Sequence, residues 1–431
     1  MSMRPHQQRQ EHANSYYAAS ANTVTDYPAL RGAHSADVCV VGGGFTGVST
    51  ALSLAERGYS VALIEGNRIS WGASGRNGGQ IISGGLGLAK IQKKYGDAVS
   101  DMVWDMKCRG ASIIRERIEK YDIDCDLKDG YLEVATKRRQ LDWLPEYVEE
   151  RRAHNYPHKY EIWDREKTCD MLGTDAFLGG FVDYQDGHLH PLNLCVGEAQ
   201  AAQGLGVQIF EQSPAIRIEH GTRVRVHSTD GHVEADSVLL AGNAYNLLEP
   251  KRLSNLVFPA GSYVVATEKL PEDVAYSINK KDVAVCDLNE VVDYYRLSAD
   301  RRLLYGGACN YSGRDPENIA EYIRPRMLKV YPQLKDVSIE YQWGGKIGIV
   351  LNRVPTVGCI NGNVFYAQGY SGHGVAPTHA MSEVMADAIT GSMERYDLWA
   401  DMKHFRIPGT QWVGNQIIAL GMMYYKLMDR L

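Results

Sequence analysis

Three glycines with the spacing G-x-G-x-x-G are the residues whose types and positions most directly indicate a chemistry. Gly42, Gly44 and Gly47 follow an apolar stretch, and Glu65 ends the next apolar stretch about 20 residues later. Such glycines allow a tight turn, a close approach of the backbone to a pyrophosphate and close helix packing, while the acid accepts hydrogen bonds from a ribose. The spacing predicts a dinucleotide site. The alternative is a flexible glycine loop that binds nothing.

The elements that must position these residues are a strand over 37–41, a helix over 45–57 and a second strand over 61–65. The first N–H groups of the helix, at Phe45 and Thr46, have no partner inside it and point toward an anion with the helix dipole. Glu65 and Gly66, at the end of the second strand, are expected on the AMP half of the ligand.

Three further glycine-rich or strand-end sites are expected to contact the same ligand, and the second of the four, Ser74 to Gln80, combines small residues with hydroxyl, guanidinium and amide donors. A helix that begins at 372–374 would direct its dipole at the negative charge of a reduced flavin. Several sites along one chain suit an elongated ligand, and extended FAD fits this description. A surface loop with an ordinary arginine and a plain strand–helix turn are the alternatives for the second and last sites. The expected cofactor residues are Gly72, Ala73, Ser74, Arg76, Asn77, Gly78, Gly79, Gln80, Ala215, Gly242, Gly369, Tyr370, Gly372, His373 and Gly374.

Composition narrows the class of protein. The chain has 431 residues and a formal net charge of −6, so we expect no nucleic-acid partner. Its eight cysteines are scattered without a C-x-x-C pair, which favours a reducing, cytoplasmic compartment and no zinc site. Residues 1–36 lack the apolar core of a secretory signal. The stretch 409–425 is too polar and short for a membrane span, so we expect a packed C-terminal helix, with a helix lying on a membrane surface as the alternative.

The alternation of strands and helices predicts an α/β protein of two domains, each assembled from separate segments. A Rossmann-like FAD-binding domain is expected over 30–100, 187–250 and 345–431. A mixed-sheet substrate domain is expected over 101–186 and 251–344, after an N-terminal extension over 1–29. Within these segments, Asp230-Gly231 predicts the turn of a hairpin between strands over 216–228 and 232–239.

Four segments resemble the FAD-dependent amine and amino-acid oxidases of the D-amino acid oxidase superfamily, which includes glycine oxidase and monomeric sarcosine oxidase. They are 37–65, the Trp71-Gly-Ala-Ser-Gly-Arg-Asn-Gly-Gly-Gln80 loop, 352–358 and 369–374. The segments 12–22 and 421–425 resemble the gamma-glutamylputrescine and gamma-glutamylpolyamine oxidases more closely. The resemblance covers about residues 12–431.

This resemblance implies a fold and a reaction. The fold is an FAD domain of the p-hydroxybenzoate-hydroxylase type, with a sheet-rich domain roofing the flavin. The reaction is oxidation of a C–N bond in a gamma-glutamylated diamine or polyamine, giving an aldehyde, ammonia and hydrogen peroxide with molecular oxygen as acceptor. Some sarcosine-oxidase relatives bind flavin covalently through a cysteine in the C-terminal part. Cys359 lacks a matching context, so we expect non-covalent FAD.

Hydride transfer depends mainly on positioning and desolvation, so we expect aromatic walls and one cation rather than a catalytic triad. Lys346 is the first substrate-positioning candidate because the related stretch lies beside the flavin; it could instead assist oxygen activation or be a solvated lysine. Tyr295 and Arg296 are the second pair, and strand alternation directs at most one of them into the pocket. Tyr263 is a further aromatic candidate, with core packing as its alternative. No metal site is expected.

Three functions remain open at this point. The first is an oxidase of gamma-glutamylated amines. The second is an FAD-dependent D-amino acid or N-methyl amino acid dehydrogenase or oxidase of the glycine/sarcosine type. The third is a flavoprotein without enzymatic activity.

Overall fold

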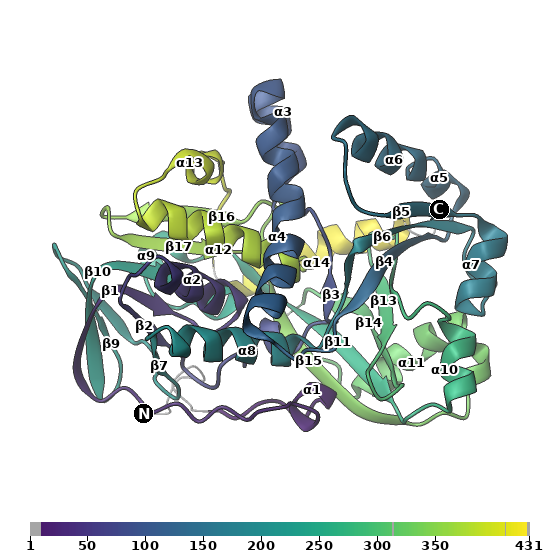
Figure 1. Cartoon of the computed structure of the whole chain (residues 1–431), viewed down its shortest axis with the longest axis horizontal. Coiled ribbons are helices and arrows are strands. Elements are labelled where there is room, and N and C mark those ends of the chain that lie inside the picture. The colour runs from purple at the N-terminus through teal and green to yellow at the C-terminus, as the bar shows by residue number, and fades with distance from the viewer. Residues whose placement is uncertain (1–9, 313, 410, 429–431) are drawn as a thin grey trace.

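The computed structural model describes residues 10–312, 314–409 and 411–428, and two β-sheets form its framework (Figure 1). In this described part the first sheet has eight strands and the second has nine. The first sheet lies on the left of Figure 1 and the second on the right, and helix α4 (Ser100–Tyr121) runs between them. The arrangement confirms the predicted α/β class with two sheet-containing halves.

The first sheet follows the order β16-β17-β10-β1-β2-β7, with β9 beside β10 and β8 beside β9. The strands from β17 to β7 are parallel, which suits their continuous apolar runs because both faces of this part are covered. Strand β9 pairs antiparallel with β10 around Asp230-Gly231, so the predicted hairpin is confirmed, although its first strand is split into β8 and β9. The bounds are β1 (Gly32–Val41), β2 (Val61–Ile64), β7 (Gln208–Phe210), β8 (Arg217–Glu219), β9 (Val224–His227), β10 (Gly231–Leu240), β16 (Thr356–Ile360) and β17 (Val364–Gln368).

The second sheet follows the order β15-β11-β14-β13-β12-β4-β6-β3, with β5 beside β6. Its neighbours are antiparallel except for β12 and β4, and a core of aromatic and aliphatic side chains packs beneath it, against α11. The bounds are β3 (Gln80–Ile81), β4 (Lys128–Ala135), β5 (Tyr160–Trp163), β6 (Gly179–His188), β11 (Phe258–Thr267), β12 (Ala284–Asp287), β13 (Asp293–Leu297), β14 (Leu303–Asn310) and β15 (Ile339–Ile349).

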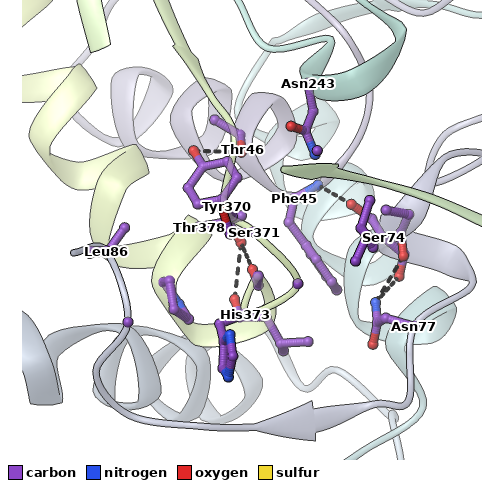
Figure 2. Close-up of a pocket in the computed structure, with 18 of the residues that line it drawn as sticks. Phe45, Thr46, Ser74, Asn77, Leu86, Asn243, Tyr370, Ser371, His373 and Thr378 are labelled. Atoms are coloured by element: carbon purple, nitrogen blue, oxygen red, sulfur yellow. Dashed lines mark hydrogen bonds between the residues drawn. The ribbon is translucent and has the colours of Figure 1, made fainter. Parts of the chain in front are cut away.

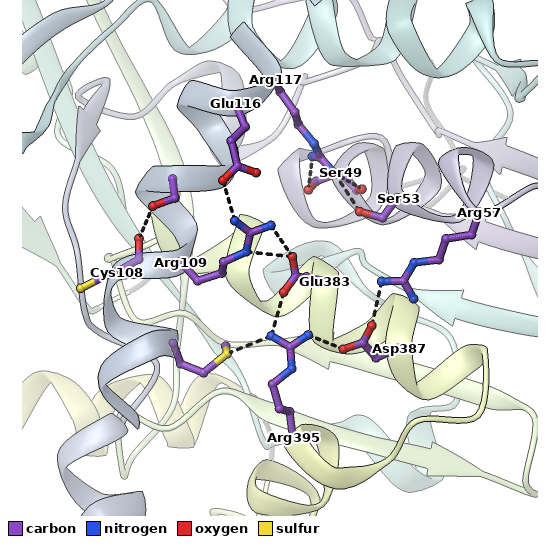
Figure 3. Close-up of polar contacts among 12 residues, drawn as sticks. Ser49, Ser53, Arg57, Cys108, Arg109, Glu116, Arg117, Glu383, Asp387 and Arg395 are labelled. Carbon is purple, nitrogen blue, oxygen red and sulfur yellow. Dashed lines mark hydrogen bonds and ion pairs between the residues drawn. The ribbon is translucent and has the colours of Figure 1, made fainter. Parts of the chain in front are cut away.

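Helices α2, α4, α8 and α12 pack against one another beside the first sheet. Figure 3 shows how polar contacts join them: Arg117 of α4 reaches Ser49 and Ser53 of α2, and Arg109 of α4 pairs with Glu383 of α12. The remaining bounds are α1 (Tyr16–Ala19), α2 (Phe45–Glu56), α3 (Leu88–Tyr95), α5 (Arg138–Leu141), α6 (Leu144–Ala153), α7 (Arg165–Leu172), α8 (Pro191–Gly204), α9 (Pro250–Leu253), α10 (Glu272–Ile278), α11 (Ile319–Val330), α12 (Val375–Ile389), α13 (Glu394–Ala400) and α14 (Gln411–Met428).

The predicted domain boundaries stay predictions, and strand pairing departs from them in two places. Strand β3 belongs to the predicted FAD segment 30–100 yet pairs with β6 of the second sheet. Strand β15 crosses the predicted boundary at 344 because it pairs with β11 along its length, as far as Ile349. Both strands lie wholly in the second sheet, so these predicted boundaries do not coincide with the division between the two sheets.

The N-terminal segment packs against both halves of the molecule. Tyr16 of α1 donates to Asp300 at 2.8 Å, Tyr17 accepts from Arg296 at 3.2 Å, and the Asn22 amide donates to Asn193 of α8 at 3.0 Å. Residues 1–9 of the predicted extension and 429–431 of the predicted FAD domain lie outside the described residues.

Helix α14 corresponds to the predicted C-terminal helix. It packs on β11, where Ile418 joins a small apolar cluster with Phe258. Over the described ranges, every helix falls short of the length and apolar character needed to cross a membrane.

Candidate active site

A cavity of about 1580 Å³ lies between the two sheets, and residues from all four predicted cofactor sites line it (Figure 2). Pockets for drug-sized ligands are typically about 300–1,000 Å³, so this cavity has room for a dinucleotide and a second molecule. The predicted residues that line it are Gly42, Gly44, Phe45, Thr46, Glu65, Gly66, Gly72, Ala73, Ser74, Arg76, Asn77, Gly78, Gln80, Ala215, Gly242, Tyr370, Gly372, His373 and Gly374. Their contact with a cofactor stays a prediction.

The turn between β1 and α2 has the geometry that the glycine spacing predicts. Gly42 has a φ of +114°, and a Cβ there would lie 2.9 Å from the carbonyl of Ala241, the residue that directly follows the neighbouring strand β10. Gly44 precedes α2 and has no side chain to cap it, so the start of the helix faces the cavity through backbone groups. The Phe45 N–H donates to Ser74 Oγ at 2.9 Å, which joins the first glycine segment to the second (Figure 2).

Glu65 lies at the end of β2 beside this turn. One of its carboxylate oxygens accepts the Gly43 N–H at 2.7 Å and the other accepts the Asn67 N–H at 2.8 Å. Burial raises the pKa of Glu65, and these backbone donors oppose that shift. A carboxylate has about four acceptor sites, so Glu65 keeps the capacity to accept from ribose hydroxyls in the cavity.

The second glycine segment is held by its own polar groups. Arg76 stacks over Trp71, with its guanidinium carbon 4.4 Å from the ring centroid, and donates to the Trp71 and Gly344 carbonyls at 2.8 and 3.2 Å. Asn77 donates to the Ser74 carbonyl at 2.7 Å and accepts from the Gly79 N–H at 2.7 Å. Arg76 therefore fixes the segment against β15 while lining the cavity.

The last glycine segment leads directly into α12. Gly372 has a φ of +95°, and Gly374 precedes the helix without a side-chain cap. Thr46 of α2 donates to the Tyr370 hydroxyl at 3.0 Å, so the first and last motifs meet although they lie far apart in sequence (Figure 2). Burial, with a smaller contribution from Arg353, lowers the pKa of His373 and favours its neutral form.

Three predicted cofactor residues pack behind the cavity wall instead. A Cβ on Gly47 would lie 1.8 Å from the Gly42 carbonyl oxygen, so Gly47 lets α2 approach β1. Gly79 has a φ of +71° and packs on the Leu189 carbonyl, while Gly369 has a φ of +88° and packs on Val350. Each supports the shape of a loop that does line the cavity.

This geometry agrees with comparisons to known proteins. The family model described as "DAO: FAD dependent oxidoreductase" matches residues 37–388. The chain belongs to this family of FAD-dependent oxidoreductases. It is 43% identical to gamma-glutamylputrescine oxidoreductase of Escherichia coli (strain K12), over 98% of this chain and 99% of the relative. It is 40% identical to the probable oxidoreductase OrdL of Haemophilus influenzae, over 98% of each chain.

The solved structure of glycine oxidase from Geobacillus kaustophilus shares the fold, with a TM-score of 0.68 and 20% identity over 83% of this chain and 95% of that chain. The residues present in this oxidoreductase also fit FAD. They provide a side-chain-free turn at a helix start, an acid with spare acceptor sites and a second uncapped helix start at Gly374.

The candidates on strand β13 are placed by the alternation of its side chains. Tyr295 faces the core, where it stacks on Tyr305 at 5.5 Å and accepts from Tyr331 at 3.0 Å. Tyr294 faces the opposite way and lines the cavity. Arg296 is buried and donates to the Gly78 carbonyl at 2.8 Å, so it supports the glycine loop from behind. Neither Tyr295 nor Arg296 belongs to the described lining of the cavity, which agrees with the expectation that at most one of them points into it but leaves no direct substrate contact for either.

Lys346 and Tyr263 both contact the carboxylate of Asp315 and lie outside the described lining of the cavity. The Lys346 ammonium lies 2.5 Å from Asp315, and the Tyr263 hydroxyl donates to the same carboxylate at 2.8 Å. The neighbours Gly345 and Ile347 line the cavity, so strand alternation turns Lys346 to the other face of β15. Neither predicted residue belongs to the described lining, which corrects their assignment to direct substrate contact.

Several cavity residues were not singled out from the sequence. Trp104 and Lys107 of α4, Glu133 of β4, and Glu150 and His154 at α6 form one group of them. Trp104 and Lys107 are three residues apart and share a helix face. The pair stands among the apolar positions of a long helix, so its orientation toward the cavity depends on the tertiary fold.

Proposed function

We propose that this oxidoreductase oxidises the primary amine of a gamma-glutamylated diamine or polyamine, of the gamma-glutamylputrescine kind. The observation that carries the proposal is the 43% identity, over nearly the full length of both chains, to gamma-glutamylputrescine oxidoreductase. In the proposed reaction, R–CH2–NH2, oxygen and water give R–CHO, ammonia and hydrogen peroxide. Oxygen is thus the proposed acceptor, and the scattered free cysteines support a reducing, cytoplasmic setting.

FAD, when bound, supplies the acceptor for the hydride that leaves the carbon beside the amine nitrogen. We propose that Glu65 and the turn at Gly42–Gly44 hold its adenosine and pyrophosphate end. The loop at 72–80 and the start of α12 at Gly374 would hold the flavin end, because residues of both segments line the cavity and α12 begins there without a side-chain cap.

Apolar side chains of the second sheet line the cavity and favour the uncharged form of the amine, which the oxidation requires. An ammonium must lose a proton before its carbon donates a hydride, and apolar surroundings favour the neutral amine. Tyr131, Tyr294 and Ile347 supply such surroundings in the cavity lining. Asp287 also lines the cavity, and burial, followed by repulsion from Asp293, raises its pKa to about 6. Asp287 attracts the cationic amine into the cavity, and because a carboxylate favours the ammonium form, the apolar side chains must outweigh it before the hydride leaves. We assign no general base.

We also propose that FAD binds without a covalent bond. Cys359 does not belong to the described lining of the cavity, whereas Cys286 and Cys309 do. Burial raises the pKa of both lining thiols, and the thiolate is the reactive form. Acid precipitation of the holoprotein should leave all of the flavin in the supernatant. Flavin that stays in the protein pellet would contradict non-covalent binding.

Anaerobic reduction of the flavin by an amine panel tests the proposed substrate class. The panel contains gamma-glutamylputrescine, free putrescine, sarcosine, glycine and D-alanine. We expect gamma-glutamylputrescine to bleach the flavin absorbance fastest, at least about 10-fold ahead of the others, since a site built around a polar group rejects analogues that lack it. Fast bleaching by sarcosine or D-alanine alone would instead favour the amino acid oxidase alternative.

The acceptor is tested in air with the substrate that bleaches fastest. Peroxide formed in a one-to-one ratio with aldehyde supports the oxidase. Turnover with a dye acceptor and almost no peroxide would make the protein a dehydrogenase. If no amine bleaches the flavin, the non-enzymatic alternative holds.

A further inference from the structure

The cavity has a second part that lies away from the glycine motifs, and we call it the α4–α6 pocket. It is formed by Trp104, Lys107, Glu133, Glu150 and His154. The Lys107 ammonium pairs with the Glu150 carboxylate across the pocket. The rings of Trp104 and His154 stack with centroids 4.2 Å apart and an interplanar angle of 9°. The pocket thus combines a flat aromatic wall with charges of both signs.

The ion pair in this pocket is open to a ligand. The side chains of Lys107 and Glu150 are 24% and 39% exposed, so neither is sealed inside the protein. Glu133 faces the same space; burial raises its pKa, while Arg151 and Lys107 oppose that shift. An α-amino-acid group carries a carboxylate and an ammonium side by side. Such a zwitterion complements a Lys–Glu pair when the two dipoles lie antiparallel.

The α4–α6 pocket adjoins the end of the cavity where α12 begins. The Gly84 N–H donates to the Lys107 carbonyl at 2.8 Å. The next residue, Gly85, packs against the start of α12, where its Cβ would lie 3.5 Å from His373 and 3.3 Å from Pro377. A two-residue segment therefore separates Lys107 from the proposed flavin end. A ligand bound at one end in the pocket can extend its other end toward that site.

We propose that the α4–α6 pocket binds the zwitterionic α-amino-acid end of the substrate, with Lys107 holding the carboxylate and Glu150 holding the ammonium. Trp104 and His154 pack on the methylene groups of this end. The inference rests on the proposed function, and it names the residues that distinguish a glutamylated amine from a free amine.

Four amides of putrescine distinguish the contribution of the α-carboxylate of the substrate from that of its α-ammonium. Gamma-glutamylputrescine carries both, glutarylputrescine keeps only the carboxylate, 4-aminobutyrylputrescine keeps only the added ammonium, and butyrylputrescine has neither. We expect Lys107→Met to raise KM about 10- to 100-fold for the two amides with the carboxylate. Glu150→Gln should do the same for the two with the added ammonium. Neither variant should change kcat for butyrylputrescine by more than about threefold, which also shows that the variants fold.

Each variant has a matched control on its own helix. Lys120 of α4 pairs with Glu56, and Glu149 of α6 pairs with Arg152, both outside the cavity lining. Lys120→Met and Glu149→Gln should leave all four KM values unchanged. A Lys107→Met variant that raises KM equally for all four amides, or for none, would overturn the inference.

Failure of the proposed function gives a different result. In that case the wild-type flavin is bleached by none of the four amides. The pocket is then tested by calorimetric binding of the same amides to the holoprotein. The same pattern of selective loss supports the pocket, and equal or absent binding of all four overturns it.

Discussion

Gly47→Ala should weaken FAD binding by about 10- to 100-fold, because the added Cβ would lie 1.8 Å from the Gly42 carbonyl oxygen. Either α2 or the turn at Gly42–Gly44 must move, and that turn lines the cofactor end of the cavity. Alanine normally stabilises a helix relative to glycine by up to about 1 kcal/mol, so a loss of FAD affinity in this variant identifies a steric cause. The measurement is a titration of the apoprotein with FAD, followed by quenching of flavin fluorescence.

Gly204→Ala is the matched control for this substitution. Gly204 ends α8, and a Cβ there would meet no atom within 4 Å. The control should bind FAD with wild-type affinity. If Gly47→Ala also keeps wild-type affinity, close packing of α2 on β1 is not required for the cofactor site.

The glycine fingerprint and its flanking elements were predictable because they depend on neighbours in sequence. The apolar strand, the turn at Gly42 and the start of α2 at Phe45 form one local unit. The last motif was predictable for the same reason, since a strand, a glycine turn and a helix follow each other over 364–389. Their meeting through Thr46 and Tyr370 depends on the tertiary fold.

Which side chains of strands β13 and β15 point toward the cavity could not be derived from the sequence in the same way. An alternating strand has two equivalent choices until its partners are known. On β13, pairing with β12 and β14 directs Tyr294 to the cavity and Tyr295 to the core. On β15, Lys346 turns to Asp315, a residue of a distant loop.

Close approaches between helices could not be predicted from the sequence either. A Cβ on Gly110 of α4 would lie 2.1 Å from the Ala376 carbonyl oxygen of α12. A single glycine within a long helical pattern usually only lowers helix propensity, so its role shows only when the partner helix is in place. The Lys107–Glu150 pair likewise joins two helices that have no local relation in sequence.

Glu198→Gln should lower the free energy of unfolding by about 3–5 kcal/mol, because it leaves the Arg117 guanidinium buried without a countercharge. Glu198 is fully buried in α8, and its carboxylate lies 2.8 Å from Arg117 of α4 and 3.2 Å from His379 of α12. Arg117 also reaches Ser49 and Ser53 of α2, as Figure 3 shows. One carboxylate thus joins the four helices beside the cofactor site. Urea unfolding of the FAD-saturated protein measures the loss.

The pH dependence of this effect has a defined sign. Burial raises the pKa of Glu198, but His379 and Arg117 outweigh it and lower the pKa below its ordinary value of about 4.3. A depressed pKa in the folded state stabilises the protein above the unfolded pKa, and that stability is lost as the pH falls through the folded pKa. The difference between wild type and Glu198→Gln should therefore be full at neutral pH and shrink below about pH 4.

Glu56→Gln is the control that shows whether the loss of unfolding free energy depends on burial of the carboxylate or only on its pairing with a cation. Glu56 of α2 pairs with Lys120 of α4 and so joins two of the same helices at the surface, where the lysine side chain is 58% exposed. Surface pairs contribute about 0–1 kcal/mol, because water already solvates both charges. Equal losses in Glu198→Gln and Glu56→Gln would show that the buried carboxylate has no special role. A large loss in Glu198→Gln alone would identify it as the residue that fixes α12, and with it the helix start at Gly374, against α2 and α4.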